Sequence, residues 1–256
     1  MITGSKILAQ FNPLRRFRVS KQGLAGETRR SPFSQSHGYY TLSPTCQIPG
    51  LDRIYEQTFS IQKAGTFVEI GAFDGDYASN TSCLADAGWF GIYVEPVPAY
   101  YELCKARHAK NERVQVFNIA IGDSNESKTL YLGGPLSTMD PEMVDLFATL
   151  DWAKGYHKGE TIEVQQVTAD DFLVMHDVPK GFNVLVIDVE GYEWNVLKRF
   201  DIRQWQPRMV IIELHDQNDD YLPMRDTCNQ IAGYFDQTGY RIVYKDLTNT
   251  IYVLGA

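Results

Sequence analysis

Residues 66–96, TFVEIGAFDGDYASNTSCLADAGWFGIYVEP, decide the fold. The first five residues form a short apolar run rich in β-formers, and this run breaks at Gly71. The segment Ala78–Ala87 then has a helix-forming composition, and Gly91–Val94 is a second apolar run that ends at Glu95. The stretch therefore predicts a strand, a glycine turn, a helix and a second strand. This is half of a nucleotide-binding α/β unit, whose ligand is expected at the carboxyl ends of the strands.

The turn after the first strand narrows the choice of ligand. A dinucleotide site has the pattern G-x-G-x-x-G, so that backbone N–H groups can approach a pyrophosphate. Here Gly71 is followed by Phe73 and Asp76 where the next two glycines would stand, and Glu69 and Asp74 add further carboxylates. Like charges about 4 Å apart repel by about 4 kcal/mol near a protein surface, which disfavours a pyrophosphate. A nucleoside with positive charge and no phosphate fits better, and S-adenosylmethionine (SAM) is such a ligand.

Further cofactor contacts are expected along the same edge of the sheet. Glu95 ends the second strand 24 positions after Gly71, where an acid accepts hydrogen bonds from a ribose diol. A third strand is predicted at Val114–Asn118, and the adenine should lie at its end, against residues 118–121. The residues predicted to contact SAM are Glu69, Gly71, Ala72, Asp74, Gly75, Glu95, Asn118, Ala120 and Asp188.

The second half of the chain continues the α/β pattern. Phe182–Asp188 and Arg208–Glu213 are near-continuous apolar runs, as expected for buried parallel strands. A helix is predicted at Asp226–Thr238, and the strands Arg241–Lys245 and Thr250–Leu254 form a closing hairpin. We therefore expect a mostly parallel seven-stranded sheet that ends in an antiparallel hairpin, with helices on both faces.

Three motifs in the chain resemble the FkbM family of SAM-dependent methyltransferases: Glu69-x-Gly71-x-x-x-Gly75, Glu95-Pro96 and the stretch DVEGYE at residues 188–193. The third motif is the most specific, and the resemblance runs from about residue 65 to the C-terminus. One departure is Glu69, where the family more often has Asp; the charge is kept. The resemblance implies a Rossmann-like class I SAM-methyltransferase fold, SAM as the cofactor and methyl transfer as the reaction.

Candidate catalytic residues lie at the ends of the fourth and fifth predicted strands. Asp188 faces the expected position of the methyl group, although it could instead cap the following helix. Glu190 is a second candidate, and here the alternative is that the helix macrodipole alone favours an acid in the first turn. His215 follows Glu213 by two positions, so both side chains point to one side if the chain stays extended. His215 is therefore the candidate general base.

No metal site is expected from the sequence. The four cysteines are widely spaced and no C-x-x-C occurs, which indicates neither a zinc site nor a redox pair. The alternative is a Mg²⁺ ion held at two adjacent strand ends by Asp188, His215 and Asp216, in the placement that catechol-type O-methyltransferases use.

Charge divides the chain into two parts. Residues 1–30 contain seven Lys or Arg residues and one Glu, whereas the whole chain has a net charge of −8. We predict a basic arm, disordered or irregular, over residues 1–45, and a single methyltransferase domain over residues 46–256. A lid-like insertion at residues 124–160 would carry acceptor selectivity. The alternatives for the arm are an organelle transit peptide and a weak contact with an anionic membrane surface.

The function predicted from these features is transfer of a methyl group from SAM to a hydroxyl of a sugar or small metabolite, in the cytoplasm unless the arm is a targeting signal. A nucleic-acid methyltransferase is the first rival. It is disfavoured because phosphate contacts need clustered Lys and Arg, and because no Pro-Pro pair follows Asp188. The second rival is a non-catalytic module that binds SAM or a partner. No apolar run reaches the roughly 18 residues of a membrane span.

Overall fold

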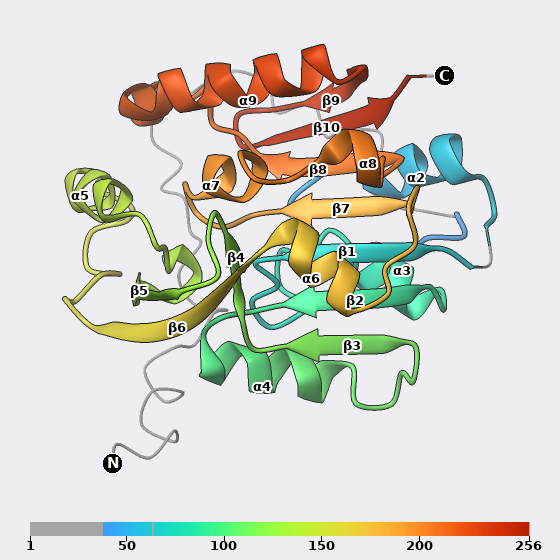
Figure 1. Ribbon diagram of the computed structural model, residues 1–256, viewed down its shortest axis with the longest axis horizontal. Coiled ribbons are helices and arrows are strands. Elements are labelled where there is room, and N and C mark those ends of the chain that lie inside the picture. The colour runs from blue at the N-terminus through green and yellow to red at the C-terminus, as the bar shows by residue number, and fades with distance from the viewer. Residues whose placement is uncertain (1–37, 63, 256) are drawn as a thin grey trace. The chain divides into compact units, whose positions relative to one another are not determined.

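The computed structural model describes residues 38–62 and 64–255, and its central feature is a seven-stranded sheet (Figure 1). The strands are β1 (Thr66–Ile70), β2 (Phe90–Val94), β3 (Val114–Phe117), β7 (Val184–Ile187), β8 (Met209–Glu213), β9 (Tyr240–Lys245) and β10 (Asn249–Leu254). Their order in the sheet is β3-β2-β1-β7-β8-β10-β9. Neighbouring strands from β3 to β8 pair in parallel, and β10 runs antiparallel to both β8 and β9. The predicted parallel sheet with a closing hairpin is therefore confirmed.

Helices cover both faces of the sheet, as predicted. One face packs against α2 (Leu51–Phe59), α3 (Ser82–Asp86) and α4 (Pro98–Arg107), and the other against α6 (Ala169–Met175), α7 (Glu193–Leu197), α8 (Ile202–Trp205) and α9 (Arg225–Gln237). In β1, Phe67 belongs to the first core and Val68 to the second, because successive side chains of a strand point to opposite faces. Within the described ranges, no helix is long and apolar enough to cross a bilayer.

A second, three-stranded sheet lies partly within the range of the predicted insertion and partly on either side of it. Its strands are β4 (Ala120–Gly122), β5 (Ser127–Tyr131) and β6 (Thr161–Thr168), in the order β4-β6-β5. The central strand β6 lies outside the predicted range of 124–160, so the insertion is built on pairings at both of its ends. Between β5 and β6 the chain forms η2 (Gly134–Leu136) and α5 (Pro141–Thr149). Figure 1 shows α5 and β5 on the side toward which the parallel strands point.

The segment at residues 38–45, before α2, packs against the domain and does not form a separate arm. Residues 1–37 of the predicted basic arm lie outside the described residues. Residues 38–45 have the predicted irregular conformation, yet Tyr40 is fully buried, with its ring against Tyr55 and Trp89. The Tyr40 hydroxyl also donates to the carbonyl of Ser60. The packed domain therefore begins before residue 46, the predicted boundary.

Gly71 allows β1 and β7 to stay paired up to their ends. Its backbone has φ +88°, a conformation that costs other residues about 1–2 kcal/mol. A Cβ atom at this position would lie 1.6 Å from the carbonyl oxygen of Asp188. The contact exists because Asp188 donates its backbone N–H to Ile70, which brings the residues that follow both strands side by side. Only glycine fits this position without separating the two strands.

Replacing Gly71 with Ala should therefore lower the melting temperature more than the same change at Gly88. Gly88 has φ +89°, but a Cβ atom there meets nothing within 4 Å, so Gly88→Ala measures the backbone cost alone. For that control we expect a fall of about 2–8 °C, from about 1–2 kcal/mol at about 2–4 °C per kcal/mol. Thermal unfolding followed by circular dichroism compares the two variants. Equal falls would show that the approach to Asp188 imposes no constraint.

Candidate active site

Glu69 organises the turn between β1 and α3 from within. Its carboxylate is buried and accepts hydrogen bonds from the hydroxyls of Ser79 (3.0 Å) and Thr81 and from the backbone N–H of Asn80 (3.4 Å). Burial raises the pKa of Glu69 to about 7, although these hydrogen bonds oppose the shift. Because residues 79–81 are used in this network, the predicted helix at 78–87 begins only at Ser82. Glu69 thus supports the turn, and its contact with SAM stays a prediction.

Other residues that were predicted to contact SAM shape the turn at residues 71–77, here called the cofactor turn. The Asp74 carboxylate accepts the backbone N–H groups of Asp76 (3.0 Å) and Tyr77 (2.7 Å). Gly75 has φ +72°, and a Cβ atom there would lie 2.7 Å from Cys104 Sγ in α4. Ala72 is buried. These contacts hold a compact turn with a carboxylate inside it, which agrees with the expectation that no pyrophosphate binds here.

Glu95 lies where a ribose-binding acid is expected, at the end of β2. Its carboxylate accepts the backbone N–H groups of Phe73 (2.8 Å) and Val97 (2.7 Å). Burial raises the pKa of Glu95 to about 8 against the effect of these two hydrogen bonds. These two donors do not use all the lone pairs of the carboxyl oxygens, so acceptor sites remain for a diol. Asn118 fixes the neighbouring backbone, since its Nδ2 donates to the carbonyls of Glu95 and Pro96 at 2.9 Å each. Ala120, the last of this group, is buried in β4.

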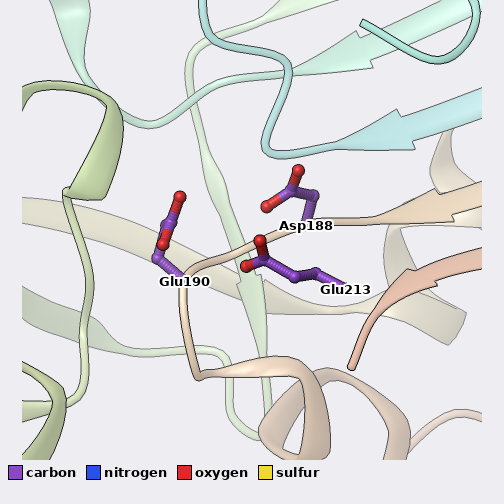
Figure 2. Close-up of side chains that lie close together, drawn as sticks. All are labelled: Asp188, Glu190 and Glu213. Atoms are coloured by element: carbon purple, nitrogen blue, oxygen red, sulfur yellow. The ribbon is translucent and has the colours of Figure 1, made fainter. Parts of the chain in front are cut away.

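Three carboxylates meet at the ends of β7 and β8 (Figure 2). In the register of the two strands Ile187 lies beside Ile212, so the next residues, Asp188 and Glu213, are neighbours. Carboxylate oxygens of Asp188, Glu190 and Glu213, here called the acid cluster, all lie within 4.8 Å of one another. The sequence predicted Asp188 and Glu190 but not Glu213. The signal was present, because Glu213 ends the strand that follows β7 in the sheet.

The loop that carries Asp188 and Glu190 is held by Glu193. The buried Glu193 carboxylate accepts the backbone N–H groups of Val189 (3.0 Å) and Gly191 (3.1 Å). Glu190 has φ +55°, a left-handed conformation that such external hydrogen bonds help to maintain. At Gly191 a Cβ atom would lie 2.2 Å from Met143 of α5, so the insertion packs directly on this loop. Sequence reasoning considered Glu193 only as a weak candidate, because the helix macrodipole alone favours an acid in a first turn.

Burial, followed by mutual repulsion, sets the electrostatics of the acid cluster. Desolvation, together with the charges of Glu213 and its neighbours, raises the pKa of Asp188 and that of Glu190 well above the usual range. Such a cluster can take up a proton from a bound hydroxyl, or it can ligate a cation that prefers oxygen, such as Mg²⁺. This ligand set differs from the predicted alternative. Asp216 is ion-paired with Lys245 instead, and Glu213 takes its place.

His215 contacts the acid cluster through Glu213. Its Nε2 lies 3.3 Å from a carboxylate oxygen of Glu213, and its Nδ1 lies 3.4 Å from the carbonyl oxygen of Leu247. Burial lowers the pKa of His215, but the Glu213 charge and hydrogen bond outweigh it, and the net shift is upward. The ring also stacks on Tyr221, with centroids 3.7 Å apart. Because both nitrogens have protein partners, this arrangement favours an imidazolium that supports Glu213.

Comparisons with known proteins find one matching family and several similar solved structures, of which two are described here. The family described as "Methyltransferase FkbM domain" matches residues 69–242. The chain is similar to an O-methyltransferase from Bacillus cereus solved in complex with SAH, with 12% identity, coverage of 83% of this chain and 84% of that chain, and a TM-score of 0.46. It is also similar to fibrillarin from Aeropyrum pernix with natively bound S-adenosyl-L-methionine, with 9% identity, coverage of 75% and 68%, and a TM-score of 0.43. None of the curated proteins matches the chain.

The raised carboxyl pKa values predict that stability falls with rising pH. Glu95, with a folded-state pKa of about 8, is protonated in the folded domain at pH 7 but ionised in the unfolded chain, where the ordinary value is about 4.3. The folded state therefore binds more protons, and the free energy of unfolding decreases as pH rises from about 4.3 to about 8 and levels off above. Glu95→Gln should flatten the slope of melting temperature between about pH 5 and 8, with the exposed Glu112→Gln as the control. A wild-type melting temperature that rises over this range would contradict the assignment.

Proposed function

Because the chain belongs to the FkbM methyltransferase family, as its three motifs predict, we propose that it transfers the methyl group of SAM to a hydroxyl oxygen of a sugar or another small metabolite. The observation that carries this proposal is the contact between the cofactor turn and the acid cluster. Gly71 begins the turn, and its Cα approaches the carbonyl oxygen of Asp188 so closely that no Cβ fits between them. A nucleoside bound to the turn would therefore have proton-accepting carboxylates beside its reactive end.

The residues present suit SAM better than a phosphorylated nucleotide. Glu95 has free lone-pair sites for the two ribose hydroxyls, and the cofactor turn already encloses the Asp74 carboxylate. The acid cluster beyond the turn favours a ligand that carries positive charge. SAM fits this donor set, since it has a sulfonium and an ammonium group, and when bound it supplies an activated methyl group.

The chain itself then has two tasks, to align the acceptor oxygen and to remove its proton. Alignment of two reacting groups is worth up to about 7–11 kcal/mol in well-oriented systems. We assign proton removal to Asp188 with Glu190, because both belong to the acid cluster and a raised pKa makes a carboxylate a stronger base. In this proposal His215 positions Glu213, and it is not the general base that the sequence suggested.

An acceptor of low negative charge suits this site. The chain has a net charge of −8, and the edge of the sheet that would hold the acceptor carries three carboxylates. A polyphosphate backbone would be repelled there, which disfavours the nucleic-acid rival. The non-catalytic rival is disfavoured because three mutually repelling carboxylates destabilise the fold unless a ligand or proton uses them.

The first test concerns the cofactor. Glu95→Gln keeps the size of the side chain but replaces one acceptor oxygen with a donor, so we expect SAM affinity to fall about tenfold, as when a buried group loses its hydrogen-bond partner. Glu112→Gln, exposed and remote from the turn, should bind SAM as the wild type does. Isothermal titration calorimetry gives both dissociation constants. Unchanged affinity in Glu95→Gln would remove Glu95 from the site.

The second test concerns the acid cluster. Asp188→Asn should lower kcat by roughly 10²–10⁴-fold, the usual contribution of a general base, while SAM still binds. The wild-type rate should fall on acidification, because a base must be ionised and the Asp188 and Glu190 pKa values are raised. His215→Gln should lower the rate less and shift the pH profile. A loss in His215→Gln as large as that in Asp188→Asn would return the role of base to His215.

The same assay distinguishes a metal-dependent reaction from one in which the carboxylates act directly. If a cation bound to the acid cluster activated the hydroxyl, EDTA would abolish activity and Mg²⁺ would restore it. If the carboxylates act directly, EDTA has no effect on the wild-type rate.

A further inference from the structure

Tyr221 connects the acid cluster with the insertion. It lies in η3 (Asp219–Met224), the short helix that follows β8, and its side chain is 4% exposed. One face of its ring stacks on His215, with an angle of 14° between the rings. The same side chain packs with Met143 and Phe147 of α5. Tyr221 therefore lies between the group that supports Glu213 and the element expected to cover the acceptor.

The hydroxyl of Tyr221 forms no hydrogen bond with any residue of the described ranges. Most buried tyrosines of residues 38–62 and 64–255 do have one; Tyr40, Tyr55 and Tyr240, for example, donate to backbone carbonyls. Tyr221 makes no such bond with a described residue, although Glu213 and Glu190 are the carboxylates whose charges act on it most strongly. The Tyr221 hydroxyl is not among the fully buried atoms that lack a partner, so it is open at the surface of the site, where a ligand can reach it. An accessible hydroxyl without a protein partner, next to the histidine that contacts Glu213, can therefore bind a group of the substrate.

The chemistry of this partner follows from the hydrogen-bond acceptors and the donor that the site provides. Ionised carboxylates only accept hydrogen bonds, so the acid cluster recognises hydroxyl groups as donors. Burial and the nearby carboxylates raise the pKa of Tyr221 far above its usual value, which keeps its phenol protonated and able to donate. The site therefore combines acceptors for one hydroxyl proton with a donor for a different oxygen.

We propose that the Tyr221 hydroxyl binds a second oxygen of the acceptor, next to the hydroxyl that is methylated, and that the acceptor is therefore a polyol such as a sugar ring. This inference rests on the proposed O-methyl transfer and adds the substrate class to it. Tyr221 acts here as an acceptor-binding residue: it takes no proton and forms no bond. The insertion contributes by holding the ring of Tyr221 against His215 through Met143 and Phe147.

The test uses the full-length protein, SAM labelled in its methyl group and a panel of methyl hexopyranosides, with methanol and phenol as simple hydroxyl acceptors. Tyr221→Phe keeps the ring, its stack on His215 and its packing, and removes only the hydroxyl. We expect kcat/KM for the best glycoside to fall about tenfold, with the affinity for SAM and the melting temperature unchanged. The matched control is Tyr252→Phe. Tyr252 is a buried tyrosine whose hydroxyl is enclosed without a partner; it lies in β10, outside the acid cluster, and its variant should keep wild-type kcat/KM.

Deoxy analogues of the best glycoside then test the contact itself. Each analogue lacks one hydroxyl next to the methylated position. With one of them the wild type should lose about as much kcat/KM as Tyr221→Phe loses on the parent glycoside, and on that analogue the two proteins should be alike. A loss in Tyr221→Phe that persists unchanged on every analogue would show a structural effect only, and wild-type kcat/KM in Tyr221→Phe would also overturn the inference.

The same assay separates this inference from the proposed function. Methylation of phenol or methanol without any glycoside would leave O-methyl transfer standing and overturn the polyol acceptor. Transfer to none of these hydroxyls, with SAM bound, would contradict both.

Discussion

The contact between the backbones of Gly71 and Asp188 fixes the relation between the two halves of the site. It arises where β1 and β7, the two central parallel strands, end beside each other in the sheet. At that point a Cβ atom on residue 71 would nearly coincide with the Asp188 carbonyl oxygen. The cofactor turn begins on one side of this contact and the loop that carries the acid cluster on the other. A change in the pairing of β1 with β7 would therefore displace both at once.

Buried carboxylates hold the loops around this contact, and each uses a different set of donors. Glu69 binds side-chain hydroxyls, Glu95 binds backbone N–H groups from two segments, and Glu193 binds the backbone of the loop that precedes it. Every one of these carboxylates is poorly solvated, which raises its pKa into the range of about 7 to 8. The acid cluster differs from them, because its members face one another, and among the described residues a protein donor, His215, is found for Glu213 but not for the carboxylates of Asp188 and Glu190. Scaffold acids and candidate catalytic acids can thus be told apart by their partners.

The sequence was most informative where structure is local. The β1–turn–β2 unit, the closing hairpin and the three motifs are contiguous stretches, so periodicity and turn residues identify them. Glu213 and Tyr221 were missed, because their importance comes from register and from stacking across the fold. The small sheet was missed in part for the same reason: β4 pairs with β6, about 45 residues away. His215 was found, but its partners Glu213 and Leu247, which argue against a free base, appear only in three dimensions.

The packing of Met143 on Gly191 has a consequence for the design of chimaeras. An insertion taken from another member of the family and grafted between β4 and β6 would bring its own residue to the position of Met143. That residue would occupy the space left by the absence of a side chain on Gly191, and it would pack against the ring of Tyr221. The insertion is thus not an independent cassette. A graft intended to change acceptor selectivity would have to carry residues 191 and 221 with it, although both lie far downstream in the gene.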